Sequence, residues 1–182
     1  MRIGERLLSY GAAYIIAEAG VNHNGDLALA HALVDAAADS RADAVKFQTW
    51  QTDSICAPGA AMADYQAIDG GADQYAMLKR LELPFAWHQE LRDHARERGI
   101  DFLSTPDDVE SARFLASLGV DVIKVGSAEL TNMLHLREIG ALGLPVILST
   151  GMASIDQVRR GIDVVRSAGA ADVAVLHCVS AY

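Results

Sequence analysis

Short apolar runs alternate with segments of helical periodicity along most of the chain. The runs are rich in β-branched residues, and they predict strands at Tyr14–Glu18, Ala44–Gln48, Ile100–Ser104, Val122–Val125, Pro145–Ser149 and Val173–His177. Apolar residues between these runs recur at the spacing of one helical face, first at Leu27, Ala30, Val34 and Ala37. This alternation is typical of βα units built around a parallel sheet.

Local signals mark the ends of the expected helices. Thr105 followed by Pro106, Asp107 and Asp108 offers an N-cap, a first-turn proline and two acids that suit a helix dipole. Ser154 and Gln157 have the spacing of a capping box. Glycines that suit left-handed C-caps follow the helical segments at Gly99, Gly119, Gly143 and Gly169.

One connection is much longer than the others. It runs from Trp50 to about Pro84, is rich in Ala, Gly and Asp, and contains a segment of helical character near its end. Long insertions after a strand are often functional, so we interpret this stretch as a flap over a pocket. The alternative is a surface excursion that serves only stability.

Two parallel architectures fit the alternation. A doubly wound sheet usually has a G-x-G-x-x-G loop after its first strand, and the segment AEAGVNHNGD after the first expected strand lacks that pattern. A (β/α)8 barrel of the TIM type gathers polar residues at the C-terminal ends of many strands, as this sequence does. The sequence therefore predicts an α/β TIM-barrel type fold, incomplete in this chain, with about six strands and five helices.

Two lysines interrupt apolar strands. Lys46 lies in AVKFQTW and Lys124 in VIKVGSAEL, on strands that we expect to be neighbours. Because lysine is rarely buried without an anionic partner, the pair predicts a pocket for a small anion. Further polar residues follow the strands and complete the candidate site: Glu18, Gln48, Thr105, Ser127, Glu129, Ser149, Ser180 and Tyr182.

Each candidate also has a structural interpretation. The lysines could extend to solvent or pair with Glu18 and Glu129, and Thr105 could be only an N-cap. The segment Ser149-Thr150-Gly151 could be only a turn. His177 suits a satisfied core histidine, whereas His23 suits a loop residue that orders the first βα turn, with a ligand role as the alternative.

Charge and cysteine content narrow the class of protein. The 15 basic and 24 acidic residues give a net charge of −9, which argues against nucleic acid or an anionic membrane as a partner. Two cysteines are too few for a disulfide framework or a thiolate metal cluster. The N-terminal segment lacks a signal-peptide core, and no apolar run is long enough to cross a bilayer. We expect a soluble, cytoplasmic protein that acts on small molecules.

Six segments, in order, resemble the sialic acid synthase family, which comprises N-acetylneuraminate synthase and its legionaminate and pseudaminate relatives. They are IAEAGVNHNGD, AVKFQTW, FLSTPDD, IKVGSAELTN, PVILSTGMAS and LHCVSAY. The resemblance implies a TIM-barrel transferase that condenses phosphoenolpyruvate with an N-acetylated hexosamine, such as N-acetylmannosamine, and releases phosphate. It also implies that residues 1–182 are the N-terminal part of the synthase domain, without the family's C-terminal antifreeze-like domain.

The resemblance also assigns roles. Positions matching Lys46, Thr105, Lys124, Ser127, Ser149 and Ser180 bind phosphoenolpyruvate in the family, and those matching Glu18, Gln48, Glu129 and Tyr182 face the reacting carbons or the sugar. Glu18 and Glu129 are the implied catalytic residues. The resemblance further implies a divalent metal, Mn²⁺ or Mg²⁺, with histidine ligands beyond Tyr182, and a homodimer when the protein is full length.

Two other functions remain compatible with the sequence. A non-catalytic remnant or anion-binding module would explain a chain that stops at Tyr182, before the metal half of the barrel. A Schiff-base aldolase on the same barrel would use one of the lysines as a nucleophile.

Overall fold

The parallel strands form two three-stranded sheets in a computed structural model that describes residues 1–9, 11–61 and 73–180. The first sheet has the order β3-β4-β5 and the second β6-β7-β8. Their bounds are β3 Ile16–Gly20, β4 Ala44–Thr49, β5 Asp101–Pro106, β6 Ile123–Val125, β7 Val146–Ser149 and β8 Val173–Leu176. Each strand expected from the sequence is therefore confirmed, with small shifts at its ends.

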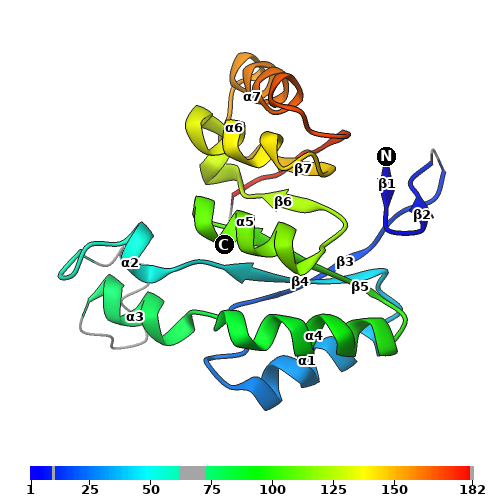
Figure 1. Ribbon diagram of the computed structural model, residues 1–182, viewed down its shortest axis with the longest axis vertical. Helices are drawn as coiled ribbons and strands as arrows, with labels where there is room; N and C mark the ends of the chain where they lie inside the picture. The colour runs from blue at the N-terminus through cyan, green and yellow to red at the C-terminus, as the bar shows by residue number, and fades with distance from the viewer. Residues whose placement is uncertain (10, 62–72, 181–182) are drawn as a thin grey trace.

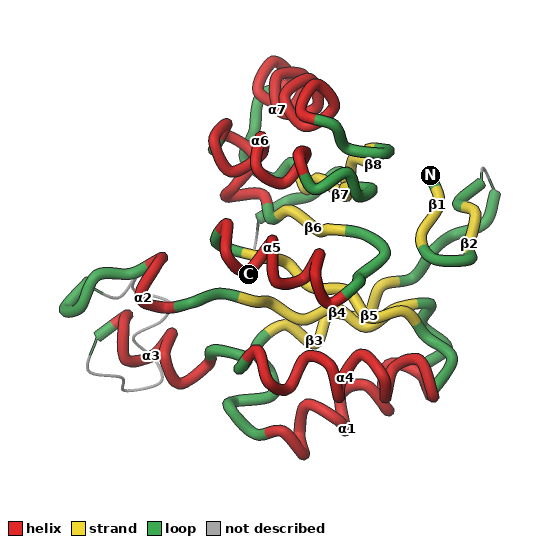
Figure 2. Tube along the Cα trace, in the orientation of Figure 1, coloured by secondary structure: helices red, strands yellow, loops and turns green. Residues whose placement is uncertain are grey.

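Helices surround the strands on their outer side (Figures 1 and 2). The longer helices are α1 Leu27–Asp39, α4 Phe85–Glu97, α5 Val109–Leu118, α6 Met133–Ala141 and α7 Ile155–Ala168. Two short helices, α2 Thr52–Ile55 and α3 Gln74–Leu81, lie beyond the C-terminal end of β4 (Figure 1). A 3₁₀ helix, η2 Ser127–Thr131, follows β6.

The helix termini agree with most of the sequence signals. Ser154 and Gln157 form the expected capping box at α7, and Gly119 ends α5 in a left-handed conformation with φ of +82°. The expected N-cap at Thr105 is wrong. Strand β5 continues through Thr105 to Pro106, and Asp108 caps α5 by accepting a hydrogen bond from the backbone N–H of Ser111.

The strands follow one another in space in the order of the sequence. Strand β5 pairs in parallel with β4 and packs against β6, which links the two sheets. Lys46 and Lys124 are therefore not on neighbouring strands, because β5 lies between β4 and β6. In a barrel of consecutive βα units, the strand between two others in sequence also separates them in space.

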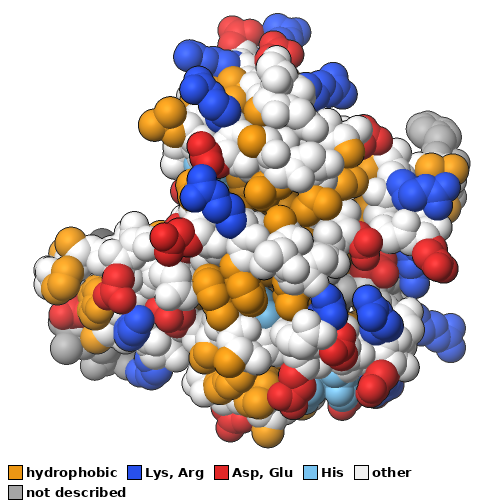
Figure 3. Space-filling model, in the orientation of Figure 1, with side chains coloured by type: hydrophobic (Ala, Val, Ile, Leu, Met, Phe, Trp, Pro, Cys, Tyr) orange, Lys and Arg blue, Asp and Glu red, His pale blue; other side chains and the backbone are white. Residues whose placement is uncertain are grey.

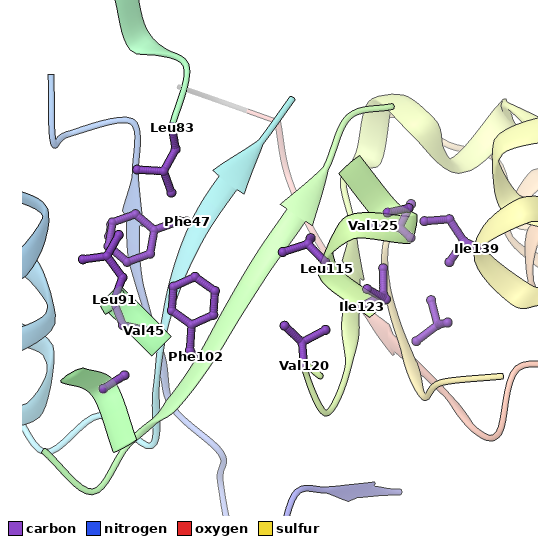
Figure 4. Packing of buried hydrophobic residues seen from close by; sticks show 14 of the residues in the cluster. Val45, Phe47, Leu83, Leu91, Phe102, Leu115, Val120, Ile123, Val125 and Ile139 are labelled. Carbon is purple, nitrogen blue, oxygen red and sulfur yellow. The ribbon is translucent and has the colours of Figure 1, made fainter. Parts of the chain in front are cut away.

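Alternate residues of the strands face the surrounding helices and form the main core. Phe47 and Phe102 stack with their ring centroids 5.7 Å apart, and Leu91 of α4 packs in the same cluster (Figure 4). Burying each such side chain stabilises the fold by roughly 1.5–3 kcal/mol. This core between the strands and the helices holds the outer face of each strand, and the alternate residues therefore point into the barrel.

A second apolar cluster fills the interior of the barrel. Its buried members come from four strands or strand starts and from the N-terminal segment: Ile3, Ala44, Leu103, Val122 and Ile147. Ile3 belongs to a short antiparallel hairpin, β1 Arg2–Ile3 with β2 Arg6–Leu7, which the sequence analysis did not predict. The hairpin lies at the N-terminal end of the strands, so the cluster closes that end of the barrel (Figure 1).

The architecture is a (β/α)8 barrel of the TIM type that is incomplete in this chain. Within the described residues, β3 and β8 have a neighbouring strand on one side only, and the barrel has six parallel strands where a closed one has eight. Leu176 of β8 is accordingly 39% exposed. No helix in the described ranges has both the length and the apolarity that a membrane span requires.

Candidate functional site

A layer of polar side chains lies above the inner apolar cluster, at the C-terminal ends of the strands. Each member follows an interior residue by two positions in its strand, so strand alternation directs it to the same inner side. The pairs are Ile16 with Glu18, Ala44 with Lys46, Leu103 with Thr105, Val122 with Lys124, and Ile147 with Ser149. The structure thus brings together five of the residues that the sequence singled out.

Lys46 connects three strands in this layer. Its Nζ lies 2.6 Å from Oε2 of Glu18 on β3 and donates a hydrogen bond of 3.3 Å to Oγ1 of Thr105 on β5. Lys46 is 7% exposed, whereas the Glu18 side chain is 56% exposed. The structural pairing with Glu18 that we weighed for Lys46 is therefore present, and it leaves the carboxylate open to solvent.

Lys124 has a different environment. Its Nζ donates a hydrogen bond of 3.0 Å to the carbonyl of Val125, and within the described residues no carboxylate lies within ion-pair distance. Burial, together with the positive charge of Lys46, lowers the pKa of Lys124 to about 8. The alternative pairing with Glu129 is not formed, since Glu129 instead accepts a hydrogen bond of 2.9 Å from Asn132. A buried ammonium group without a counterion favours binding of an anion.

The hydroxyl groups of Ser127 and Ser180 lie close to Gly151, in the same region as Lys124. The backbone N–H of Gly151 donates to Oγ of Ser127 at 3.0 Å, and the Ser180 hydroxyl is the nearest atom to the position of a Cβ at Gly151. Ser149 is 6% exposed and ends β7 in the same region. Glycine at position 151 therefore permits the loops after β6, β7 and β8 to approach one another.

Cys178 belongs to the same group of residues, although the sequence alone did not identify it as a site residue. Burial alone would raise the pKa of its thiol, but hydrogen bonds from Ser149 and the Thr150 backbone, with the charge of Lys124, outweigh burial and lower it. The position of Cys178 just after a strand, between His177 and Ser180, was the only signal in the sequence.

Asp107 is a second residue near the site that the sequence alone did not identify as a site residue. Asp107 is partly buried, and desolvation together with the nearby charge of Glu129 raises the pKa of its carboxyl group, although Lys46 and Lys124 act in the opposite direction. The sequence signal was present in Ser104-Thr105-Pro106-Asp107-Asp108, but the two acids suited a helix N-terminus equally well.

The remaining expectations have mixed outcomes. His177 is exposed rather than a core histidine, because within the described residues no strand covers the outer edge of β8. His23 is fully buried, and its Nδ1 accepts a hydrogen bond of 3.1 Å from the N–H of Gly25, which orders the turn as expected. Gln48 of β4 lies in register with Thr105 of β5. Tyr182 lies outside the described residues, as do residues 62–72 of the expected flap.

The described residues contain no group of three His, Cys, Asp or Glu side chains that could hold a metal ion. The residues present therefore do not fit the divalent metal that the resemblance implies.

Positive and negative side chains are interspersed on the face of the protein shown in Figure 3.

Two ammonium groups, several hydroxyls and the backbone N–H groups of the strand ends can together hold an anion with two charged groups. Lysines bind phosphate and carboxylate as point charges, and hydroxyl and N–H donors then fix the orientation. Glu18 places a carboxylate beside this anion site, within reach of solvent.

Comparisons with known proteins agree with this description. The NeuB family model matches residues 33–182. The N,N'-diacetyllegionaminic acid synthase of Campylobacter jejuni is 44% identical over 172 residues, which cover 92% of this chain and 52% of that protein. The chain thus spans about half the length of this curated relative.

Solved structures show the same fold. The Bacillus subtilis spore coat polysaccharide biosynthesis protein SpsE has a TM-score of 0.81 and 35% identity, covering 100% of this chain and 48% of that one. The N-acetylneuraminic acid synthetase of Leptospira borgpetersenii, solved in complex with citrate, has a TM-score of 0.79 and 30% identity. That match covers 99% of this chain and 61% of the other.

Proposed function

Because the chain belongs to the NeuB family, we propose that it carries the phosphoenolpyruvate site of a synthase that makes a nonulosonic acid. The second substrate is an N-acetylated hexosamine, N-acetylmannosamine or a related sugar, and phosphate is released. The observation that carries this proposal is the pair of buried lysines at the strand ends, one of them without a carboxylate partner among the described residues. The relative from Campylobacter jejuni, a legionaminic acid synthase by name, supports the same class of product.

In this proposal each polar side chain at the barrel mouth has a defined task. Lys46 and Lys124 neutralise the phosphate and carboxylate of phosphoenolpyruvate, and the hydroxyls of Thr105, Ser127, Ser149 and Ser180 orient them. Gln48 and Tyr182 contact the sugar. Holding the enol carbon against the sugar aldehyde lowers the entropic cost of reaction, because both partners are already positioned.

The proposed reaction forms one carbon–carbon bond and one carbon–oxygen bond, and it breaks the carbon–oxygen bond to phosphate. C3 of the enol attacks the aldehyde carbon, and a water oxygen adds to C2, after which C2 expels phosphate and becomes a ketone. One proton of that water ends on the new hydroxyl and the other on phosphate. Glu18 and Glu129 are the proposed groups that move these protons, and the solvent-exposed carboxylate of Glu18 suits contact with water.

The divalent metal, the homodimer and a cytoplasmic location stay predictions. None of the proposed steps uses the metal, because the described residues do not supply a site for it. The partners in this proposal are small molecules, not nucleic acid or a membrane surface.

The lowered pKa of Lys124 is the one feature that suits the second candidate, a Schiff-base aldolase. Such an enzyme needs a neutral lysine that forms an imine with pyruvate. Borohydride reduction in the presence of pyruvate would attach the substrate covalently to Lys124, and intact mass would detect it. We expect no added mass, because the synthase reaction passes through no imine.

Binding of phosphoenolpyruvate, measured by isothermal titration calorimetry, tests the proposal directly on this chain. Replacing either buried lysine, as Lys46→Ala or Lys124→Ala, removes a charge-assisted contact, and we expect the affinity to fall by roughly 10- to 100-fold. Lys79, the third lysine, is about half exposed on α3, so Lys79→Ala is the matched control and should bind as the parent does.

Two results would contradict the proposal in different ways. A parent protein that binds no phosphoenolpyruvate would favour a remnant that has lost the site. Binding that is unchanged in both lysine variants would place the ligand elsewhere and remove the assignment of the site residues.

A further inference from the structure

Gly151 lies at the barrel mouth, where the loops after three strands meet. It follows β7 and is buried, and its neighbours include side chains from the loops after β6 and β8. A Cβ atom at this position would overlap Oγ of Ser180 and would lie 3.0 Å from Oγ of Ser127. The two hydroxyl groups therefore occupy the space that any side chain at position 151 would need.

The backbone of Gly151 does not itself require glycine. Gly151 is not among the glycines with positive φ, whereas Gly143 ahead of β7 is. The next residue, Met152, has a φ of +63° although it carries a side chain. Non-glycine residues rarely adopt this conformation, so the surroundings hold the turn in a specific shape. The close approach of neighbouring atoms is thus the reason for glycine at position 151.

Hydrogen bonds keep the three loops together. Oγ1 of Thr150 donates a hydrogen bond of 2.8 Å to the carbonyl of Leu176 at the end of β8. The N–H of Gly151 donates one of 3.0 Å to Oγ of Ser127, which follows β6. Because both neighbouring loops are tied to this turn, a methyl group at position 151 would displace the hydroxyl groups rather than the loops.

The hydrogen bond from Gly151 also orients the hydroxyl group of Ser127. Since Oγ of Ser127 accepts the N–H of Gly151, its own proton is directed away from Gly151 and can be donated to another group. Cys178 lies within hydrogen-bond reach of Ser127 and close enough to Lys124 for their charges to interact. The hydroxyl group and the ammonium group of Lys124 therefore share one region of the barrel mouth.

We propose that Gly151 is a positioning residue, which brings the hydroxyl groups of Ser127 and Ser180 together beside Lys124 so that both donate to the bound anion. Two hydroxyl donors and an ammonium group surround a phosphate or carboxylate oxygen more completely than the lysine alone. Phosphoenolpyruvate is the bound anion here, so this role of Gly151 rests on the proposed function. The tasks assigned above to the serines do not include Gly151.

A double-mutant cycle on phosphoenolpyruvate binding, measured by isothermal titration calorimetry, tests this role. In the parent, Ser180→Ala removes one donor, and we expect the affinity to fall roughly tenfold. Gly151→Ala displaces both hydroxyl groups and should lower the affinity by about 10- to 100-fold. In the Gly151→Ala background, Ser180→Ala should change the affinity by less than about twofold, because that hydroxyl group no longer reaches the anion.

The same cycle has a second readout that needs no ligand. Gly151→Ala should lower the midpoint of urea denaturation, because the added methyl group has no room. Ser180→Ala in that background should restore part of the loss, since it removes the atom nearest to the methyl group. A midpoint that Ser180→Ala does not restore would contradict the close approach on which the role depends.

Gly161→Ala is the matched control. Gly161 is buried in α7, and a Cβ atom there would lie 2.9 Å from Cδ1 of Leu130, so its added methyl group is also crowded but lies outside the site. Gly161→Ala should bind phosphoenolpyruvate as the parent does, and Ser180→Ala should still cost roughly tenfold in its background. An equal cost of Ser180→Ala in the parent and in Gly151→Ala would overturn the role of Gly151 while leaving the proposed function intact. Absence of binding in the parent would overturn both.

A measurement on the unmodified protein covers the case in which Gly151→Ala fails to fold. In ¹⁵N–¹H NMR spectra, phosphoenolpyruvate should shift the amide signal of Gly151, because its acceptor Ser127 then donates to the anion. The amide signal of Gly143, which precedes β7 at the other end of that strand, should not move. A Gly151 signal that is unchanged at saturation would contradict the proposed role without any variant.

Discussion

The two layers of the barrel interior lie two residues apart on the same strands, yet they have opposite properties. The lower layer, with Ala44, Leu103, Val122 and Ile147, is apolar and closed from below by Ile3. The upper layer lies two residues further along the strands and consists of Glu18, Lys46, Thr105, Lys124 and Ser149. One step of strand alternation, about 6.6 Å, therefore separates the part of the interior that holds the barrel together from the part to which we assign binding.

The energetic consequences of the two layers also differ. A buried aliphatic side chain in the lower layer stabilises the fold by roughly 1.5–3 kcal/mol. The upper layer buries two ammonium groups, and the lowered pKa of Lys124 means that its charged form is less stable in the folded protein than in water. The buried charge at the strand ends thus lowers the free energy of unfolding, in the region that we assign to substrate binding.

The largest effect on stability is expected in the lower layer. Leu103 is 1% exposed, so Leu103→Ala should leave a cavity and reduce the free energy of unfolding by about 2–5 kcal/mol. Urea denaturation measures this loss. Where the variant is still folded, the affinity for phosphoenolpyruvate should stay within about threefold of the parent, because the residue does not reach the barrel mouth. A large loss of affinity in fully folded protein would show that the two layers are not independent.

Lys124→Met should have the opposite sign of effect on stability. Removing a buried charge whose pKa is lowered to about 8 should raise the free energy of unfolding at pH 7 by about 1–3 kcal/mol, while the affinity for phosphoenolpyruvate falls by roughly 10- to 100-fold. The pH dependence identifies the cause. Between pH 8 and about 10.5 the unfolded chain holds the Lys124 proton and the folded chain does not, so stability of the parent should rise with pH in this window. A Met variant that keeps this rise would show that another group is responsible.

The sequence predicted the strands and the polar layer because both depend on local pattern. Lys46 and Lys124 interrupt apolar runs, and period-two alternation suffices to place them on the inner side. The hairpin at Ile3 was not predictable in this way, since strands of two residues have no period. Asp107 was missed for a different reason. Whether an acid after a strand faces the barrel or the helix depends on where the strand ends, and one further hydrogen bond to Thr49 decides this.

The smallest effect on stability and binding is expected at Thr105, whose hydroxyl accepts a hydrogen bond from Lys46. Thr105 accepts a hydrogen bond of 3.3 Å from Lys46, which is also held by Glu18, so Thr105→Val keeps the shape of the side chain and the ion pair. Loss of one long hydrogen bond should change stability by less than about 1 kcal/mol and weaken phosphoenolpyruvate binding by about two- to tenfold. Ser117→Ala, on the exposed side of α5, serves as a control for removal of a hydroxyl outside the site. If Thr105→Val binds as tightly as the Ser117 variant, the Thr105 hydroxyl positions Lys46 without contacting the substrate. Orientation of the substrate would then depend on the hydroxyls of Ser127, Ser149 and Ser180.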